Sequence, residues 1–171
     1  MKYSRRADRV TLAATGTAWT GHGIRTVESE IEEILDGARS NIVIVAYAIG
    51  AGGLAFLERV EDCLARGIEV TMILNKLPRQ DSKVQTKIRA LAKEYTYFTA
   101  FSFEPSNDKE ALHAKVLVVD SSIALVGSAN LSMRGLVLNH ELGVVITGPI
   151  VFRILRLLSE LSTDHRTKRV T

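Results

Sequence analysis

Apolar residues recur three or four positions apart in three stretches of the chain, which is the spacing of an amphipathic helix. A short apolar run follows each of these stretches. The first two runs do not alternate with polar residues, as is typical of strands covered on both faces of a sheet. Regular alternation of helix and strand favours parallel pairing through crossover helices. The expected helices cover residues 27–40, 54–67 and 82–95, and the expected strands cover 41–50, 68–75 and 97–101.

The later part of the chain is predicted to be mainly strands. Two apolar runs, 111–120 and 122–128, meet at a polar turn and indicate a β-hairpin. A short helical turn at 131–135, a strand at 138–148 and a helix at 149–161 that begins with proline are expected to follow. Antiparallel strands added to parallel units predict an α/β fold, with a mixed β-sheet flanked by helices on both faces.

The distribution of charge and apolar residues predicts three segments. Residues 1–25 are basic and irregular, which indicates an N-terminal arm or an edge segment. Residues 26–162 hold the periodic pattern and are long enough for one compact domain with a core. Residues 163–171 form a polar C-terminal tail that we expect to be frayed.

Composition constrains the cellular compartment of the protein more than it constrains the function. The chain has 171 residues, a formal net charge of +3 and one cysteine, Cys63, in an apolar helical stretch. One cysteine cannot form an internal disulfide, so a reducing compartment is allowed. We find no unbroken apolar region of a signal peptide and no apolar stretch long enough to span a membrane. A cytoplasmic location without membrane contact is therefore expected, and the mild positive charge suits a polyanionic partner without requiring one.

The sequence HAKVLVVD, residues 113–120, sets polar residues into an apolar strand. Residues two apart on a strand share a face, so His113 and Lys115 should project together, with Asp120 at the strand end. The hairpin returns the chain so that the sequence GSAN, residues 127–130, comes back level with His113. Glycine allows a close backbone approach there. Ser128 and Asn130 would then offer hydrogen-bond donors beside the histidine and the lysine.

These residue types suit phosphoryl transfer. An imidazole can act as a nucleophile or as an acid–base group near neutral pH. A lysine and an amide can hold negative oxygens as charge develops on a phosphoryl group. A carboxylate, here Glu141 at the start of a later strand, can orient a histidine through its second ring nitrogen. Such a site needs neither a metal nor a cofactor.

The spacing of these residues resembles the signature of the phospholipase D superfamily. The matching elements are His113-x-Lys115-x4-Asp120, the GSxN sequence at 127–130, and the later Glu141. The resemblance implies that residues 26–162 form a catalytic domain. His113 would attack phosphorus and form a phosphohistidine, Lys115 and Asn130 would hold the phosphate oxygens with support from Ser128, Glu141 would orient a histidine, and Asp120 would be structural.

The family site uses two such motifs, whereas this chain has one. None of the other histidines, His22, His140 and His165, begins an HxK sequence. A second chain would then have to supply the second histidine, which predicts a two-fold homodimer. The smallest family members, bacterial endonucleases, are similar in length and are built this way. The chain also resembles the phospholipase-D-like proteins of antiphage defence systems such as DISARM, so DNA is the expected substrate and other defence subunits are candidate partners.

Other interpretations stay open. The same chemistry would serve a phospholipase or a phosphatidyl transferase, and the chain would also suit a nucleic-acid-binding subunit with an idle site. A zinc site made of His113, His140 and Glu141 fits by residue type, although the spacing does not favour it. The basic run from 76 to 93 is a phosphate-binding surface or merely a solvated helix face. Its candidate nucleic-acid contacts are Lys76, Arg79, Lys83 and Lys87.

Overall fold

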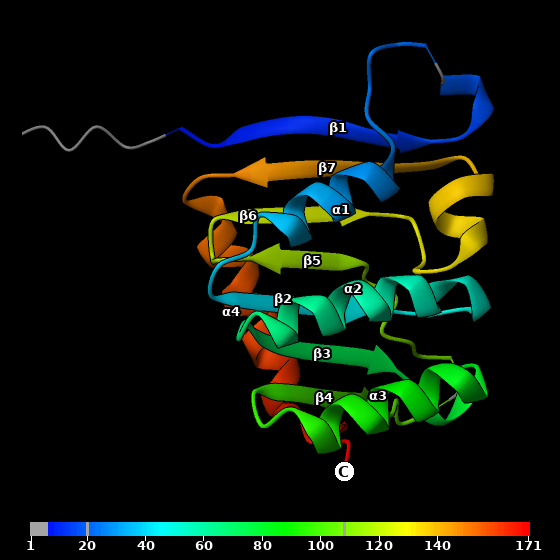
Figure 1. Cartoon of the computed structure of the whole chain (residues 1–171), viewed down its shortest axis with the longest axis vertical. Coiled ribbons are helices and arrows are strands. Elements are labelled where there is room, and N and C mark those ends of the chain that lie inside the picture. The colour runs from blue at the N-terminus through cyan, green and yellow to red at the C-terminus, as the bar shows by residue number, and fades with distance from the viewer. Residues whose placement is uncertain (1–6, 20, 108) are drawn as a thin grey trace, which may run out of the picture.

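The computed structural model describes residues 7–19, 21–107 and 109–171. In this part of the chain eight strands form one sheet, in the order β1-β7-β6-β5-β2-β3-β4-β8 (Figure 1). The β2, β3 and β4 strands pair in parallel, and every other neighbouring pair is antiparallel. The strands are β1 (Arg9–Thr15), β2 (Asn41–Ala46), β3 (Glu69–Asn75), β4 (Phe98–Phe103), β5 (Val116–Val119), β6 (Ile123–Gly127), β7 (Glu141–Thr147) and β8 (Thr167–Arg169).

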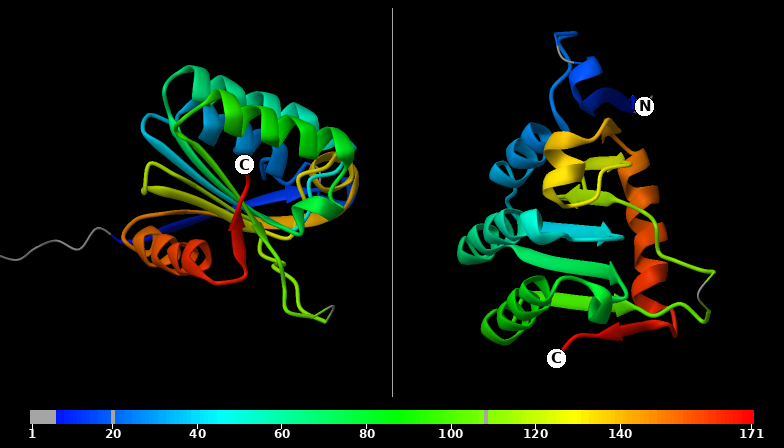
Figure 2. Two further views of the ribbon diagram at one scale, coloured as in Figure 1. Left: turned by 90° about the horizontal axis from the view of Figure 1, so that it is seen from below. Right: turned by 90° about the vertical axis from the view of Figure 1, so that its right-hand side faces the viewer.

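Helices cover both faces of this sheet. Three of them lie together on one face, and α4 lies alone on the other (Figure 2). The predicted α/β fold, a mixed sheet flanked by helices on both faces, is therefore confirmed. The helices are α1 (Val27–Asp36), α2 (Leu54–Ala65), α3 (Ser82–Glu94) and α4 (Ile150–Thr163), and the short turns are η1 (Thr17–Trp19), η2 (Ala51–Gly53), η3 (Leu77–Arg79) and the π-helical η4 (Arg134–Leu138).

Two layers of core explain why the central strands lack polar alternation. On β2, Ile42 and Ile44 pack in the larger cluster with α1, α2 and α3. Val45 points to the opposite face and packs with Val151 and Leu158 of α4. Successive side chains of a strand face opposite sides of the sheet, so a strand between two helical layers must be apolar at every position.

The sheet register places the start of β5 beside the end of β2. These two strands run antiparallel, with Val116 opposite Val45. Residues immediately before β5 therefore lie close to residues immediately after β2. The parallel strands β2 and β3 also have their carboxyl ends at this end of the sheet. The segment that enters β5 at this end of the sheet carries His113 and Lys115, whereas Asp120 lies at the other end of β5.

Several element boundaries differ from the prediction, and three of the differences affect the His113 motif or the segments that follow it. β5 begins at Val116, so His113 and Lys115 precede the strand rather than lie on it. The N–H of Leu112 is donated to the side chain of Asn75, 3.0 Å away, instead of to a neighbouring strand. The turn expected at 131–135 is η4 at Arg134–Leu138, and the last predicted strand begins at Glu141 rather than at residue 138.

The prediction of a frayed C-terminal tail is wrong. Thr167–Arg169 forms β8, which pairs with β4 and is the outermost strand on that side of the sheet. Val170 is buried, and its N–H donates to the carbonyl of Ala100. One apolar residue in a polar tail gives too weak a periodic signal to predict this strand. At the other edge, β1 pairs with β7 along its whole length.

The remaining sequence observations concern Cys63 and the membrane. Cys63 is buried, and this burial raises the pKa of its thiol. Among the described residues, no helix combines the length and the apolar character needed to cross a bilayer.

Candidate phosphodiester site

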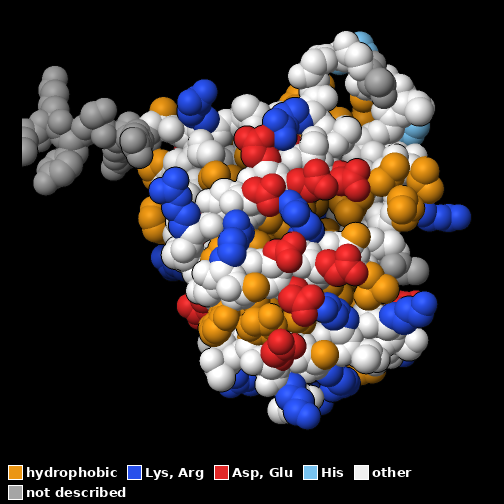
Figure 3. All heavy atoms as spheres, in the orientation of Figure 1, with side chains coloured by type: hydrophobic (Ala, Val, Ile, Leu, Met, Phe, Trp, Pro, Cys, Tyr) orange, Lys and Arg blue, Asp and Glu red, His pale blue; other side chains and the backbone are white. Residues whose placement is uncertain are grey.

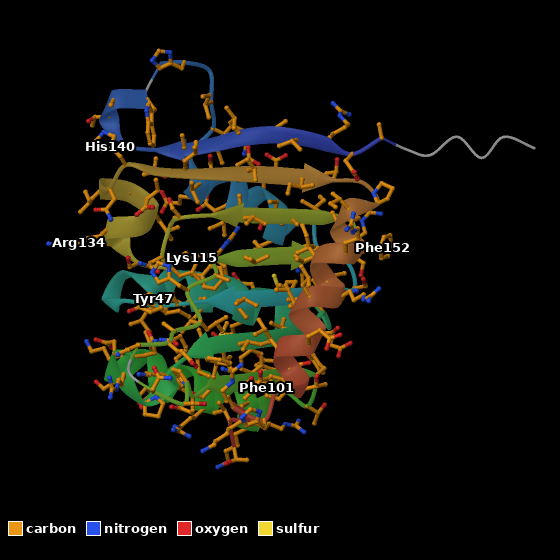
Figure 4. The ribbon with its side chains drawn as sticks, turned by 180° about the vertical axis from the view of Figure 1, so that it is seen from behind. Tyr47, Phe101, Lys115, Arg134, His140 and Phe152 are labelled. Carbon is orange, nitrogen blue, oxygen red and sulfur yellow. The ribbon has the colours of Figure 1, made fainter. Side chains whose placement is uncertain are left out.

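The His113 side chain lies in a small cluster with Lys115 and Tyr47. The ammonium of Lys115 is 3.0 Å from His113 Nδ1 and 3.2 Å from Nε2, and it also donates to the His113 carbonyl at 2.8 Å. The Tyr47 ring packs against the imidazole with 4.5 Å between centroids and lies 5.2 Å from the Lys115 ammonium. Figure 4 shows Tyr47 and Lys115 together at one end of the sheet, whereas Phe152 lies toward the other end. The Lys115 ammonium thus lies within hydrogen-bond distance of both ring nitrogens of His113.

The environment of Lys115 shifts its protonation equilibrium. Burial lowers the pKa of Lys115 below its ordinary value of 10.5, and the nearby Glu141 carboxylate opposes this by favouring the ammonium. The lysine side chain also borders a mostly apolar cavity of about 30 Å³. A partly desolvated ammonium interacts more strongly with a neighbouring anion than a solvated one does.

Ser128 and Glu141 form a second contact next to the first. The Ser128 hydroxyl donates to Glu141 Oε2 at 2.5 Å, and Asn139 Nδ2 donates to Oε1 at 3.1 Å. The Ser128 hydroxyl in turn accepts the N–H of Leu142 at 3.2 Å. Ser128 follows β6, and Glu141 begins β7, so the antiparallel pairing of these strands holds the two side chains together.

Asn130 follows Ser128 by two residues and is half buried. Among the described residues, its Oδ1 is a buried side-chain atom without a hydrogen-bond partner. Its backbone carbonyl accepts the N–H of Ser132 at 2.9 Å. A buried amide with unused hydrogen-bonding capacity is costly unless a ligand or water completes it. The orphan Oδ1 would be completed by a hydrogen-bond donor, whereas the Nδ2 group of the same amide could donate to a phosphate oxygen.

Asp120 lies away from the imidazole, on the turn between β5 and β6. Its carboxylate accepts the N–H groups of Arg39, Ser40 and Asn41, at 2.9, 2.8 and 3.2 Å, and the Ser40 hydroxyl at 2.9 Å. Burial alone would raise the pKa of Asp120, but these hydrogen bonds bring it below its ordinary value. The contacts tie the hairpin to the turn between α1 and β2, which agrees with a structural role for this motif residue.

Comparison with known proteins assigns the family. A family model described as cardiolipin synthase, PLD-like domain, matches residues 31–162. The chain belongs to the phospholipase D superfamily. The DISARM protein DrmC of Bacillus paralicheniformis is 30% identical over 148 residues, which are 86% of this chain and 60% of DrmC. The chain thus spans somewhat more than half of that relative's length.

Solved structures give the same fold. Nuc from Salmonella typhimurium, a phospholipase D family member, matches with a TM-score of 0.75 at 16% identity, over 96% of this chain and 99% of Nuc. NucT from Helicobacter pylori matches with a TM-score of 0.70 at 19% identity, over 90% of this chain and 93% of NucT. At these identities the likeness concerns the phospholipase-D-like fold.

The other histidines lie outside this phospholipase-D-like site. His140 accepts the N–H of Ala18 at its Nε2, 3.2 Å away, and meets the Trp19 ring edge-on, so it holds the N-terminal segment. His22 and His165 are exposed. The described residues contain no group of three or more His, Cys, Asp or Glu side chains that could hold a metal ion. The structure therefore does not assemble the zinc site considered for His113, His140 and Glu141.

The four basic residues considered for nucleic acid separate into two groups. Lys76 and Arg79 line a pocket together with Tyr47, beside the phospholipase-D-like site. Lys83 and Lys87 lie on α3, and the Lys87 ammonium is paired with Glu61 at 2.5 Å. Acidic and basic side chains are interspersed over the face covered by α1, α2 and α3 (Figure 3). A mixed face of this kind suits a solvated surface better than a continuous track for phosphates.

Sequence reasoning missed three residues that shape the site. Tyr47 contacts both His113 and Lys115. Asn75 holds the segment before His113 through the N–H of Leu112. Gln80 donates to the carbonyls of Tyr47 and Asn75 and accepts the N–H of Ile49. Only Tyr47 had a usable signal, because it lies in the apolar run 41–50 that was expected to form a strand.

Proposed function

We propose that the chain is a phosphodiesterase that cleaves DNA through a covalent phosphohistidine. The observation that supports this best is the contact between His113 and Lys115. The Lys115 ammonium lies 3.0 and 3.2 Å from the ring nitrogens of His113, and Ser128, Glu141 and Asn130 come from the same end of the sheet. Phosphoryl transfer requires a nucleophile, a cation and hydrogen-bonding groups close together. This end of the sheet provides all three.

In the proposed reaction, a ring nitrogen of His113 attacks phosphorus as the P–O bond to the leaving group breaks. A second imidazole donates its proton to the leaving oxygen. Water then attacks the phosphohistidine, the P–N bond breaks, and the second imidazole takes a proton from the water. Lys115 and Asn130 contact the phosphate oxygens, where negative charge grows in each transition state. This sequence of steps requires no metal ion.

The second imidazole is proposed to be His113 of a second copy of the chain. The three other histidines of the sequence lack the motif, and His140 is engaged with Ala18. Exposed apolar side chains cluster on η4, on the residue before it and at the start of β7, and such a cluster is unusual for a fully solvated surface. A two-fold axis near His113 would cover these side chains and complete the site. They are Met133, Val137, Leu138 and Leu142.

DNA is the proposed substrate because of the relationship to DrmC, a protein of the DISARM system, and other defence-system subunits are proposed as partners on the same basis. Lys76 and Arg79 beside the site suit a polyanion. The description of the family model, cardiolipin synthase, keeps a phospholipid substrate as the second candidate. The third candidate is a subunit that binds nucleic acid but does not cleave it.

The first test is cleavage of labelled single- and double-stranded DNA in excess EDTA, with His113→Ala in parallel. We expect cutting that survives EDTA and is lost in the variant. The phosphohistidine itself would be trapped by rapid acid-free denaturation and detected by mass on the peptide that contains residue 113. DNA binding without cleavage would contradict the proposal and favour the binding subunit. Release of a headgroup from phospholipid vesicles, with no action on DNA, would favour the lipid enzyme.

A further inference from the structure

Tyr47 contacts the candidate nucleophile, although the proposed reaction gives it no chemical step. Its ring packs against the His113 imidazole with 4.5 Å between centroids and 53° between the ring planes. The Lys115 ammonium lies 5.2 Å from the centre of the same ring. Tyr47 and Lys115 lie together at one end of the sheet (Figure 4). One aromatic side chain therefore touches both polar residues of the HxK motif.

The sheet register explains why Tyr47 meets both residues of the motif. β2 and β5 run antiparallel, and Val45 lies opposite Val116. Two positions further along, the same register sets Tyr47 opposite Ala114, the residue between the histidine and the lysine. Diagonal neighbours of this kind are within reach of an aromatic side chain. The contact thus follows from the backbone pairing of two central strands.

One hydrogen-bond network holds both sides of this contact. The Gln80 side chain donates to the carbonyls of Tyr47 and Asn75 at 3.1 and 2.7 Å. Asn75 is buried, and its side chain accepts the N–H of Leu112 at 3.0 Å, directly before His113. The turn that carries the tyrosine and the segment that carries the histidine are therefore attached to each other. Their separation is set before a substrate binds.

The imidazole of His113 has few other restraints. Residues 111–115 are not paired as a strand, and the His113 side chain is exposed. Among the described residues, its only other polar or ring contact is with the Lys115 ammonium, which lies near both ring nitrogens at the end of a flexible side chain. An exposed side chain without packing samples several rotamers. The Tyr47 ring is therefore the restraint that can select one orientation.

The contact restrains His113 without occupying its nitrogen atoms. In the described part of the chain, no hydrogen bond joins Tyr47 to His113, and the Tyr47 hydroxyl has no hydrogen-bond partner. The interaction is carried by the aromatic ring alone. A ring nitrogen of the imidazole is thus left available for attack on phosphorus.

We propose that Tyr47 is a positioning residue, whose ring holds the His113 imidazole in the orientation from which a ring nitrogen reaches phosphorus. The inference rests on the proposed function, because it takes His113 to be the nucleophile. Orientation of a nucleophile lowers the barrier to the chemical step and contributes little to substrate binding. The role requires an aromatic ring at position 47, whereas the hydroxyl is dispensable.

The test compares Tyr47→Leu, which removes the ring, with Tyr47→Phe, which keeps it. Hydrolysis of bis(p-nitrophenyl) phosphate gives kcat and KM for each variant. We expect Tyr47→Leu to lower kcat roughly tenfold while KM changes by less than about twofold. Tyr47→Phe should recover most of the lost rate. Tyr47→Met also removes the ring, with an unbranched side chain, and replaces Tyr47→Leu if that variant unfolds.

Tyr95 offers a matched control. It is also half buried, and its ring meets the ring of Tyr97 edge-on, with 5.8 Å between centroids. It follows α3 and precedes β4, so it lies at the opposite end of the sheet from His113. Tyr95→Leu removes a comparable ring and should leave kcat and KM near their wild-type values.

A second measurement reports on the imidazole without any turnover. The four histidines of the chain give ring-proton NMR signals, and the His113 signals are those that disappear in His113→Ala. A neighbouring aromatic ring displaces such signals. We therefore expect the His113 signals to move in Tyr47→Leu toward those of the exposed His165, and to stay in place in Tyr47→Phe and Tyr95→Leu.

Three results would overturn the inference, and they can be told apart. His113 signals that do not move in Tyr47→Leu would show that the ring does not orient the imidazole. Signals that move while kcat stays unchanged would show that this orientation does not limit the reaction, and the phosphodiesterase proposal would stand. A wild-type protein that hydrolyses no diester would reject the proposed function itself, and the positioning role with it.

Discussion

The charge of Lys115 decides the alkaline limit of the proposed reaction. Burial lowers the pKa of Lys115, and Glu141 partly opposes this. If the ammonium must be present to hold the phosphate, activity is lost as pH rises through that lowered pKa. We therefore expect the alkaline limb of kcat/KM to fall below pH 10.5, the ordinary lysine value.

Substitution of Glu141 tests this electrostatic link. Glu141→Gln removes a negative charge that favours the ammonium, so the pKa of Lys115 should fall further and the alkaline limb should move to lower pH. Ser128→Ala is the control, because it removes the 2.5 Å hydrogen bond but leaves the carboxylate charged. It should reduce the rate without moving the limb. An unchanged pH profile in Glu141→Gln would show that the two groups are not coupled.

Asp120 should matter for stability rather than for chemistry. Its carboxylate accepts three backbone N–H groups of the turn between α1 and β2. We expect Asp120→Asn to lower the free energy of unfolding at pH 7 by about 1–2 kcal/mol, the usual scale for charged hydrogen bonds. Asparagine also tolerates the positive φ of 52° at this position, so backbone strain does not confuse the result.

The pH dependence of this effect follows from the sign of the shift. The folded-state pKa of Asp120 is below its ordinary value of 3.8, so its contribution is fully present above that value and is lost as pH falls through the folded-state pKa. Urea unfolding of wild type and Asp120→Asn should therefore give a constant difference near neutral pH and a shrinking one in acid. A difference that grows in acid would contradict this account.

At the scale of elements, the π-helical turn η4 packs tightly on the GSAN segment. A Cβ on Gly135 would overlap the backbone carbonyl of Asn130 and would lie 2.8 Å from its N–H nitrogen. Gly135→Ala must therefore displace the backbone that carries the Asn130 amide. We expect a loss of about 1–3 kcal/mol in unfolding free energy, as for overpacked cores, together with lower activity.

The control for Gly135→Ala lies in the same turn. Val137 is exposed, so Val137→Ala should change stability by no more than about 0.5 kcal/mol. Chemical unfolding of both variants, and cleavage by Gly135→Ala and by wild type, would separate the two cases. If Gly135→Ala were as stable as Val137→Ala and as active as wild type, η4 would not position Asn130.

The C-terminal strand gives a second prediction at this scale. Val170 is buried, whereas Lys168 in the same strand is exposed. We expect Val170→Ser to lower the unfolding free energy by about 1–2 kcal/mol through lost burial, and Lys168→Ser to leave it nearly unchanged. Thermal melting of the two variants is sufficient. Equal melting temperatures would mean that the segment is frayed in solution, as its polar sequence suggested.

Local pattern predicted most of the elements, and it failed where distant contacts decide. The helical face of α1 and the two-sided burial of β2 follow from periodicity alone. The pairing of β8 with β4 does not, because it joins a short polar tail to a strand more than sixty residues earlier. The His113 segment was placed on a strand for a similar reason. Its apolar neighbours continue the pattern, but the Asn75 amide captures the N–H of Leu112.

The candidate site could be predicted as far as its spacing carried information. A hairpin and the strand that follows it fix the sequence distances within the motif. This local pairing brings together at one end of the sheet His113, Lys115, Ser128 and Glu141. Tyr47 comes from an element more than sixty residues away, and only the antiparallel register of β2 and β5 places it on the imidazole. Residue spacing cannot supply such a register.

At the scale of the whole molecule, the proposed homodimer follows from the presence of one HxK motif per chain. If each reaction needs His113 from two copies, an inactive partner must silence an active chain. Wild type and His113→Ala are unfolded together and refolded in known ratios, so that subunits mix at random. Hydrolysis of bis(p-nitrophenyl) phosphate is then measured, since this small diester does not depend on the natural substrate.

The shape of the mixing curve distinguishes the two assemblies. If only dimers with two intact histidines work, activity follows the square of the wild-type fraction, and an equal mixture keeps about a quarter of it. If each chain works alone, activity is proportional to that fraction, and about half remains. Wild type refolded with Lys93→Gln, a variant of an exposed lysine far along α3, controls for losses in refolding. A proportional curve would mean that the second proton donor lies within the same chain, and the two-fold arrangement around His113 would have to be abandoned.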